Sequence, residues 1–98
     1  METLSLMTAN IYKPVVADIL GVHRETAIDW TYRLGWNGDA PEPGQFFQVS
    51  VPRVGEAPIS ASGRGDGWVE LTIRNVGRVT NAIFAMGVGD RLHLRGPY

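Results

Sequence analysis

The chain contains no cysteine, which excludes disulfide bonds, thiolate metal sites and iron–sulfur clusters within its 98 residues. Its only histidines are His23 and His93, too few to indicate a histidine-rich metal site. Neither lies beside a recognisable serine or aspartate motif, so both are interpreted as surface residues and no catalytic triad is predicted. The carboxylates are scattered, with no pair at a spacing typical of general acid–base catalysis. The sequence therefore predicts no catalytic residue and no metal site, and assigns any chemistry to a cofactor.

Strong charge and long apolar runs are also lacking. Nine basic and ten acidic residues give a net charge of −1, which offers no field to attract nucleic acid or an anionic membrane surface. No apolar run approaches the length needed to span a bilayer. The first residues also lack the basic segment and apolar core of a signal peptide. Together with the absence of cysteine, these features favour a cytoplasmic protein.

Glycine and proline are plentiful: 12 glycines and 6 prolines stand between short apolar runs, a punctuation typical of short strands. The runs expected to be strands are 15–22, 27–36, 45–51, 57–61, 68–74 and 91–95. The glycine-rich segment 62–67 is expected to be a hairpin tip. Thr80 is expected to cap a short helix over residues 81–86, between the fifth and sixth strands. Residues 1–13 are expected to be a lead-in, and 14–98 a single domain.

Apolar and polar residues alternate along several of these runs, which predicts half-buried strands with one apolar face. The residues expected on the apolar faces of the second, third and fifth strands are Ile28, Trp30, Tyr32, Leu34, Phe47, Val49, Val51, Val69, Leu71 and Ile73. Six short strands in so few residues suit an all-β fold closed into a barrel, because closure removes exposed edges. A two-sheet sandwich is the alternative architecture.

The first candidate site is the stretch Ala57-Pro58-Ile59-Ser60. Proline cannot donate a hydrogen bond to a strand ladder, so Pro58 indicates an edge, a bulge or a strand whose next neighbour is missing. At such an opening the Ser60 hydroxyl and backbone groups are placed to contact a planar ligand, with Ile59 as an apolar surface beneath it. A simple edge strand explains the same residues equally well.

The second candidate site is Arg74 with the turn Gly77-Arg78-Val79-Thr80. The turn opens a helix, so its N–H groups and the helix dipole favour a phosphate there. Arg74 is placed to make a bidentate contact with that phosphate, and Arg78 to add charge. An ordinary threonine-capped helix beside two solvated arginines fits the spacing at least as well.

The order PGQFFQVSVPRVGEAPIS, a GDGW hairpin, LTIRNVGRVT and GDRLHLRGPY resembles the flavin-binding barrel of the ferredoxin–NADP reductase superfamily. Within it the chain is most similar to the electron-transfer subunits of anaerobic sulfite reductases. The corresponding subunits of dihydroorotate dehydrogenase and of some cytoplasmic hydrogenases are more distant. The resemblance covers roughly residues 10 to 98 and implies a six-stranded antiparallel Greek-key barrel that binds FAD.

The resemblance also implies roles for single residues. The Arg-x-Tyr-Ser type motif of the superfamily falls on residues 57–60, where Ser60 matches and is expected near the reactive edge of the isoalloxazine ring. Ile59 replaces the aromatic residue that stacks on the flavin. Ala57 replaces the arginine that meets the pyrophosphate, a charge that Arg74 is expected to supply. The residues implied to hold the cofactor are Ala57, Pro58, Ile59, Ser60, Thr72, Ile73, Arg74, Gly77, Val79 and Thr80.

The resemblance implies a domain of an NAD(P)H-dependent electron-transfer oxidoreductase, in which electrons pass from a nicotinamide through FAD to an iron–sulfur centre and a catalytic reductase subunit. In such proteins a Gly-Pro-Tyr-Gly turn leads to a nicotinamide-binding domain and a cysteine cluster. This chain ends at Tyr98, so these 98 residues alone are not expected to take hydride from NADH. The alternative is a cofactor-free barrel acting as a binding or assembly module. Two motifs in register with one family favour the flavin hypothesis.

Overall fold

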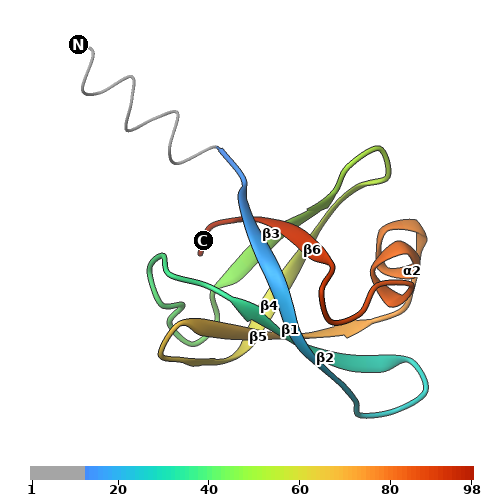
Figure 1. Ribbon diagram of the computed structural model, residues 1–98, viewed down its shortest axis with the longest axis horizontal. Coiled ribbons are helices and arrows are strands. Elements are labelled where there is room, and N and C mark those ends of the chain that lie inside the picture. Colours follow the sequence, from blue (N-terminus) through green and yellow to red (C-terminus); the bar gives the residue numbers. More distant parts are fainter. Residues whose placement is uncertain (1–12) are drawn as a thin grey trace.

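The computed structural model describes residues 13–98, and the expected lead-in lies outside this part of the chain except for Lys13. Six strands and one helix make up the described residues (Figure 1). The elements are β1 Val15–Arg24, β2 Asp29–Gly35, β3 Phe46–Val51, β4 Gly55–Gly65, β5 Trp68–Arg74, α2 Arg78–Phe84 and β6 Arg91–Arg95.

The six strands form a closed antiparallel barrel in the order β1-β2-β5-β4-β3-β6, with β6 pairing back onto β1. Strands β3, β4 and β5 form consecutive hairpins and β2 lies beside β5, which is a Greek-key arrangement. The expected six-stranded barrel with a short helix before its last strand is therefore confirmed, and the sandwich alternative is wrong.

The barrel interior is filled by apolar side chains that alternate along the strands. The buried core consists of Ala17, Ile19, Tyr32, Leu34, Trp36, Phe47, Val49, Val51, Val69, Leu71, Ile73, Ile83, Leu92 and Leu94. The alternation expected for β3 and β5 is confirmed. The prediction for Ile28 is wrong, because β2 begins at Asp29 and Ile28 lies in the preceding turn with 48% of its surface exposed.

β4 is much longer than expected, since it continues through residues that were predicted to form a hairpin tip. The chain reverses only at Asp66 and Gly67. The glycines that suggested a wide turn instead make room for side chains of β5: a β-carbon at Gly65 would lie 2.3 Å from the indole ring of Trp68. A bulge between Ala61 and Gly63 shifts the β4–β5 register.

The helix α2 begins three residues earlier than expected, with Gly77 as its N-cap, so the prediction that Thr80 caps the helix is wrong. Thr80 lies in the first turn, where its Oγ1 accepts hydrogen bonds from the N–H groups of Gly77 (3.0 Å) and Val76 (2.9 Å). The threonine hydroxyl therefore satisfies these amides from within the helix. Residues 13–98 include no helix with the length and apolar character of a membrane span.

His93 points out of the barrel but is not the solvated residue that was predicted. It lies between Val16 of β1 and Ser50 of β3, which leave it half-buried. Its Nδ1 is enclosed and has no hydrogen-bond partner among the described residues. Across residues 13–98, no three histidine, aspartate or glutamate side chains gather as metal ligands would.

Candidate functional site

β4 exchanges one neighbour for another halfway along its length. Residues 55–60 pair with β3, whereas pairing with β5 begins only at Ala61, opposite Leu71. Residues 72–74 of β5 pair with β2 alone among the described residues. The two strands thus separate, and we call the space between residues 55–60 of β4 and 72–74 of β5 the β4–β5 gap (Figure 1).

Pro58 lies on the side of β4 that faces this gap. The Ala61 N–H donates to the Gln45 carbonyl on the β3 side (3.1 Å). Because N–H groups alternate along a strand, Ala57 and Ile59 also face β3, while Pro58 and Ser60 face the β4–β5 gap. The missing N–H of Pro58 therefore costs no ladder hydrogen bond. The interpretation of Pro58 as marking a strand with a missing neighbour is the one that this register supports.

The start of α2 lies beside the β4–β5 gap. Figure 1 shows the β3–β4 hairpin reaching over the helix, and a β-carbon at Gly55 would lie 3.2 Å from Val79 Cγ2. A shallow depression of about 190 Å³ lies between them, lined by Ala57 and by residues 76–80. We call it the α2 hollow. It brings together one residue of the first predicted segment and the whole of the 77–80 turn, which lie some 20 residues apart in the sequence.

The side chains of residues 57–60 point alternately to the two faces of β4. Ile59 lies opposite Phe47 and packs against the core. Ala57, which is also half-buried, lines the α2 hollow. Pro58 and Ser60 are exposed on the outer face, where Ser60 lies opposite Phe46. The motif therefore presents a small apolar surface to the inside and a hydroxyl group to the outside.

The turn before α2 is tied by Thr80, which is 5% exposed. Besides accepting the two amides described above, its hydroxyl lies 3.1 Å from the Gly77 carbonyl. That hydroxyl is thus engaged within the turn. The N–H groups of residues 78–80, by contrast, donate to no acceptor within residues 13–98. These three amides are the ones that the first turn of a helix leaves without a backbone partner.

Residues 72–74, also predicted to hold the cofactor, do not line the α2 hollow. The Ile73 side chain is fully buried in the core. On the outer face, Thr72 Oγ1 lies 2.9 Å from the hydroxyls of both Ser62 and Thr31. This row of hydroxyls joins β4, β5 and β2 at the point where the β4–β5 gap begins.

Arg74 is held toward β2 by Asp29. Its Nε donates to Asp29 Oδ1 (2.8 Å) and its Nη2 to Oδ2 (3.1 Å). The hydrogen bonds from Arg74 and then from Thr26 hold the pKa of Asp29 below its usual value. The bidentate contact expected of Arg74 is thus made, but to a carboxylate of this chain.

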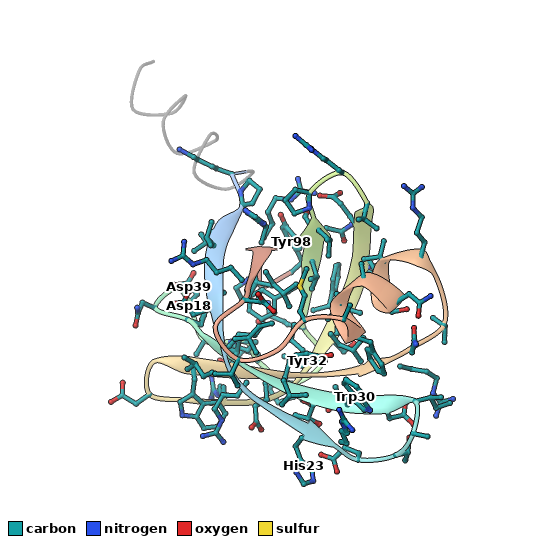
Figure 2. All side chains as sticks on the ribbon, turned by 45° about the vertical axis from the view of Figure 1, so that its right-hand side comes forward. Asp18, His23, Trp30, Tyr32, Asp39 and Tyr98 are labelled. Carbon is teal, nitrogen blue, oxygen red and sulfur yellow. The ribbon has the colours of Figure 1, made fainter. Side chains whose placement is uncertain are left out.

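Two aromatic groupings escaped the sequence analysis. Trp30 stacks on Phe84 of α2, with ring centroids 4.2 Å apart, and Figure 2 shows Trp30 and Tyr32 on the β2 side beneath the helix. Tyr98 exchanges two backbone hydrogen bonds with Phe46 and lies with its ring 5.6 Å away. Since Phe46 is opposite Ser60, Tyr98 lies on the same outer face. The alternating pattern predicted that Trp30 lies on an apolar face, but its stacking on Phe84 is known only from the folded structure.

The chain is similar in sequence to part of several longer enzyme subunits. No protein-family model matches it. It is 45% identical over 96 residues to the sulfhydrogenase 2 subunit gamma of Pyrococcus furiosus, covering 91% of this chain and 33% of that protein. It is 42% identical over 76 residues to the sulfhydrogenase 1 subunit gamma of the same organism, covering 76% and 23%. A probable dihydroorotate dehydrogenase B (NAD(+)) electron transfer subunit from Methanopyrus kandleri is 35% identical over 89 residues, with 88% and 33% covered. The chain thus spans about a quarter to a third of the length of these relatives.

The same barrel occurs in the cytochrome b5 reductase domain of Ulva prolifera nitrate reductase, with a TM-score of 0.70 and 18% identity. The alignment covers 91% of this chain and 41% of that chain, and it shows a shared fold. The relatives named above are sulfhydrogenase and dihydroorotate dehydrogenase subunits, so the sulfite reductase branch is not singled out. The sequence relatives and the shared fold together support the assignment of this barrel to the ferredoxin–NADP reductase superfamily.

Proposed function

We propose that the chain is the FAD-binding domain of an NAD(P)H-dependent electron-transfer oxidoreductase subunit. The observation that carries the proposal is the α2 hollow at the β4–β5 gap, where Ala57 meets the 77–80 turn. An incidental edge strand does not require a second predicted motif beside it. The names of the sequence relatives, which are electron-transfer and sulfhydrogenase subunits, support the same function.

The groups around the β4–β5 gap fit a flavin dinucleotide. The exposed Ser60 offers a hydroxyl group, and its N–H faces the gap, as argued from the strand alternation above. Pro58 and Ile59 add apolar surface on the two faces of the strand. Hydrogen-bond donors next to an apolar surface suit the polar edge and the flat ring of an isoalloxazine. Bound FAD would supply the redox chemistry, while these residues hold and orient it.

The α2 hollow suits the phosphate part of the same ligand. Its volume of about 190 Å³ is below the roughly 300–1,000 Å³ of pockets that enclose a whole ligand. We therefore assign it to the pyrophosphate, with the amides of residues 78–80 as donors and with Gly77 and Thr80 shaping the turn. Thr72 and the backbone of Ile73 would flank the ribityl chain. Arg74 would join the phosphate only by giving up part of its pairing with Asp29.

For the whole protein, we propose a nicotinamide-binding domain and an iron–sulfur region following the barrel, and a catalytic reductase subunit as the electron acceptor. The acceptor proposed from the sequence is of the anaerobic sulfite reductase kind. The hydrogenase and dihydroorotate dehydrogenase relatives favour the same arrangement with other acceptors. We propose the cytoplasm as its location, on the absence of cysteine and of strong charge.

Adding FAD to the purified chain tests the proposed function. We expect a shift of the visible flavin spectrum and a change in its fluorescence, because the ring would leave water for a protein surface. Ser60→Ala should weaken this binding. Ser50→Ala is the matched control, since Ser50 lies on the outer face of β3 and donates to Glu56. An unchanged flavin spectrum at high micromolar concentration would leave the cofactor-free binding module as the better proposal.

A further inference from the structure

The helix α2 is too short to hold its conformation and position by itself. It has seven residues, and isolated helices shorter than about 12–15 residues are marginal in water. It carries no acidic residue in its first turn and no basic residue in its last, so no side-chain charge at its ends favours the helix dipole. The position of α2 on the barrel therefore depends on the residues against which it packs.

α2 contacts both sides of the β4–β5 gap. On one side it packs against β3 and β4, where a β-carbon at Gly55 would lie 3.2 Å from Val79 Cγ2. On the other side its last turn lies against β2, the strand that pairs with residues 72–74 of β5. Residues 55–60 of β4 and residues 72–74 of β5 are not paired with each other. The contacts of α2 with β4 and with β2 thus bridge a gap that no strand pairing closes.

The contact of α2 with β2 is made by three aromatic residues, Trp30, Tyr32 and Phe84, which we call the α2 aromatic cluster (Figure 2 labels the first two). The ring of Trp30 stacks on that of Phe84 with centroids 4.2 Å apart and planes 13° from parallel. Arg24 lies over the indole as well, 4.5 Å from its centroid. The indole N–H is enclosed and has no acceptor among the described residues. Contacts of the ring, and not a hydrogen bond, therefore fix Trp30 against the helix.

A hydrogen bond from Tyr32 is the second link between β2 and α2. Tyr32 is fully buried, and its hydroxyl donates to the Ile83 carbonyl of α2 (3.2 Å). Burial raises the pKa of Tyr32 to about 12, so the hydroxyl keeps its proton and remains a donor at neutral pH. The last turn of α2 is thus fixed to β2 by one stacked ring and one buried hydrogen bond.

We propose that Trp30 and Tyr32 are positioning residues for the flavin site: they hold α2 against β2 and so set the width of the β4–β5 gap without touching the ligand. This inference rests on the proposed function and gives β2 a part in it. No member of the α2 aromatic cluster lines the α2 hollow, so its effect on a ligand there must pass through the helix. Binding sites lose affinity when their supporting residues leave them loose by about 1 Å.

FAD titrations of two Trp30 variants test the inference. Trp30→Ala should weaken FAD binding roughly tenfold, because the last turn of α2 loses the ring on which it stacks. Trp30→Phe should bind FAD within about twofold of the wild type, since it keeps an aromatic ring and gives up an N–H that has no partner. Tyr32→Phe, which removes one hydrogen bond, should weaken binding by roughly threefold. Wild-type affinity in Trp30→Ala would overturn the inference.

Leu34→Ala separates positioning from general stability. Leu34 is fully buried on the same strand, but it lies opposite Val69 in the part of the barrel that β5 closes. Urea denaturation should show a loss of stability in this variant, yet its folded fraction should bind FAD as the wild type does. If Trp30→Ala weakens FAD binding no more than Leu34→Ala does, both compared as folded protein, Trp30 has a structural role alone and the inference is wrong.

The position of α2 can also be measured without flavin. Because the chain has no cysteine, two introduced cysteines carry spin labels at known positions. Ala85 at the end of α2 and Asp66 in the β4–β5 turn are exposed, and neither lines the α2 hollow. The distribution of distances between labels at Ala85 and Asp66 should be shifted or broader in Trp30→Ala, and unchanged in Trp30→Phe and Leu34→Ala. An unchanged distribution in Trp30→Ala would contradict the inference.

The two measurements separate this inference from the proposed function. A wild-type chain that binds no FAD loses the flavin function, while a displaced helix in Trp30→Ala would still show that Trp30 positions α2. A chain that binds FAD equally well in the wild type and in Trp30→Ala keeps its flavin function and loses the positioning residues, whatever the label distances.

Discussion

The two halves of β4 are built for different purposes although they form one continuous strand. Residues 61–65 pair with β5 and carry glycines that admit the side chains of Trp68 and Glu70 across the strand. Residues 55–60 pair with β3 alone and carry a proline on the side that faces the β4–β5 gap. Residues 61–65 close the barrel, whereas residues 55–60 leave backbone N–H groups and the Ser60 hydroxyl uncovered. A closed barrel thus keeps one uncovered strand edge, and this is the edge that we propose to bind the ligand.

The largest difference between the two halves should be in stability. Leu71, fully buried opposite Ala61, belongs to the closed half, and Ile59, half-buried, belongs to the open one. Leu71→Ala should lower the free energy of unfolding by about 2–5 kcal/mol, because it leaves a cavity that the barrel cannot fill. Ile59→Ala should cost less than half as much. Urea denaturation of both variants measures this, and equal losses would show that the open half is as much a part of the core as the closed one.

The packing of the open half against α2 depends on Gly55. Its φ of 146° is one that side chains rarely adopt, and a β-carbon there would lie 3.2 Å from Val79 Cγ2, closer than an ordinary contact. Gly55→Ala should lower the free energy of unfolding by about 1–3 kcal/mol and weaken FAD binding, because the backbone would be strained and the Val79 side chain would have to shift. Gly87→Ala is the matched control, since nothing lies within 4 Å of that position. Thermal unfolding followed by circular dichroism compares the two, and similar losses would contradict the proposed role of Gly55.

A gain of affinity tests the open half more directly. Ala57 lines the α2 hollow, where the superfamily motif has an arginine. Ala57→Arg should bind FAD roughly tenfold more tightly, worth about 1.4 kcal/mol. Ala57→Leu is the control for added bulk without charge. Fluorescence titration gives both dissociation constants, and tighter binding by the leucine variant would point to apolar contact in place of phosphate recognition.

How far the sequence predicts this molecule depends on how local each feature is. Both ends of β5 were predicted correctly. Its alternating pattern follows directly on the Gly67 turn, and Gly77 lies shortly beyond its other end. β4 was predicted too short, since Gly63 and Gly65 read as turn residues until the ring of Trp68 is seen lying across the strand. That contact depends on the pairing of two strands and leaves no local signal.

The candidate site divides in the same way. The position of Pro58 beside a missing neighbour follows from proline chemistry, and the 77–80 turn follows from the expected start of a helix; the resemblance then named FAD as the ligand. The separation of β4 from β5, which leaves residues 55–60 with one neighbour, is visible only once the strands are paired. The pairing of Arg74 with Asp29 likewise needs the Greek-key order, which sets the second strand beside the fifth.

The smallest effect concerns that ion pair and its dependence on pH. Asp29 has a folded-state pKa below its usual 3.8, through hydrogen bonds from Arg74 and Thr26. Because the folded pKa is depressed, its contribution to stability is fully present well above pH 3.8 and is lost as pH falls through the folded value. Asp29→Asn should therefore lower the melting temperature slightly at pH 7 and by less at pH 3. Asp18→Asn, which breaks the ion pair with Arg91, is the control. If Asp29→Asn also tightens FAD binding, the released Arg74 reaches the phosphates, and the β5 side of the gap takes a larger part in binding than the pairing in the free chain indicates.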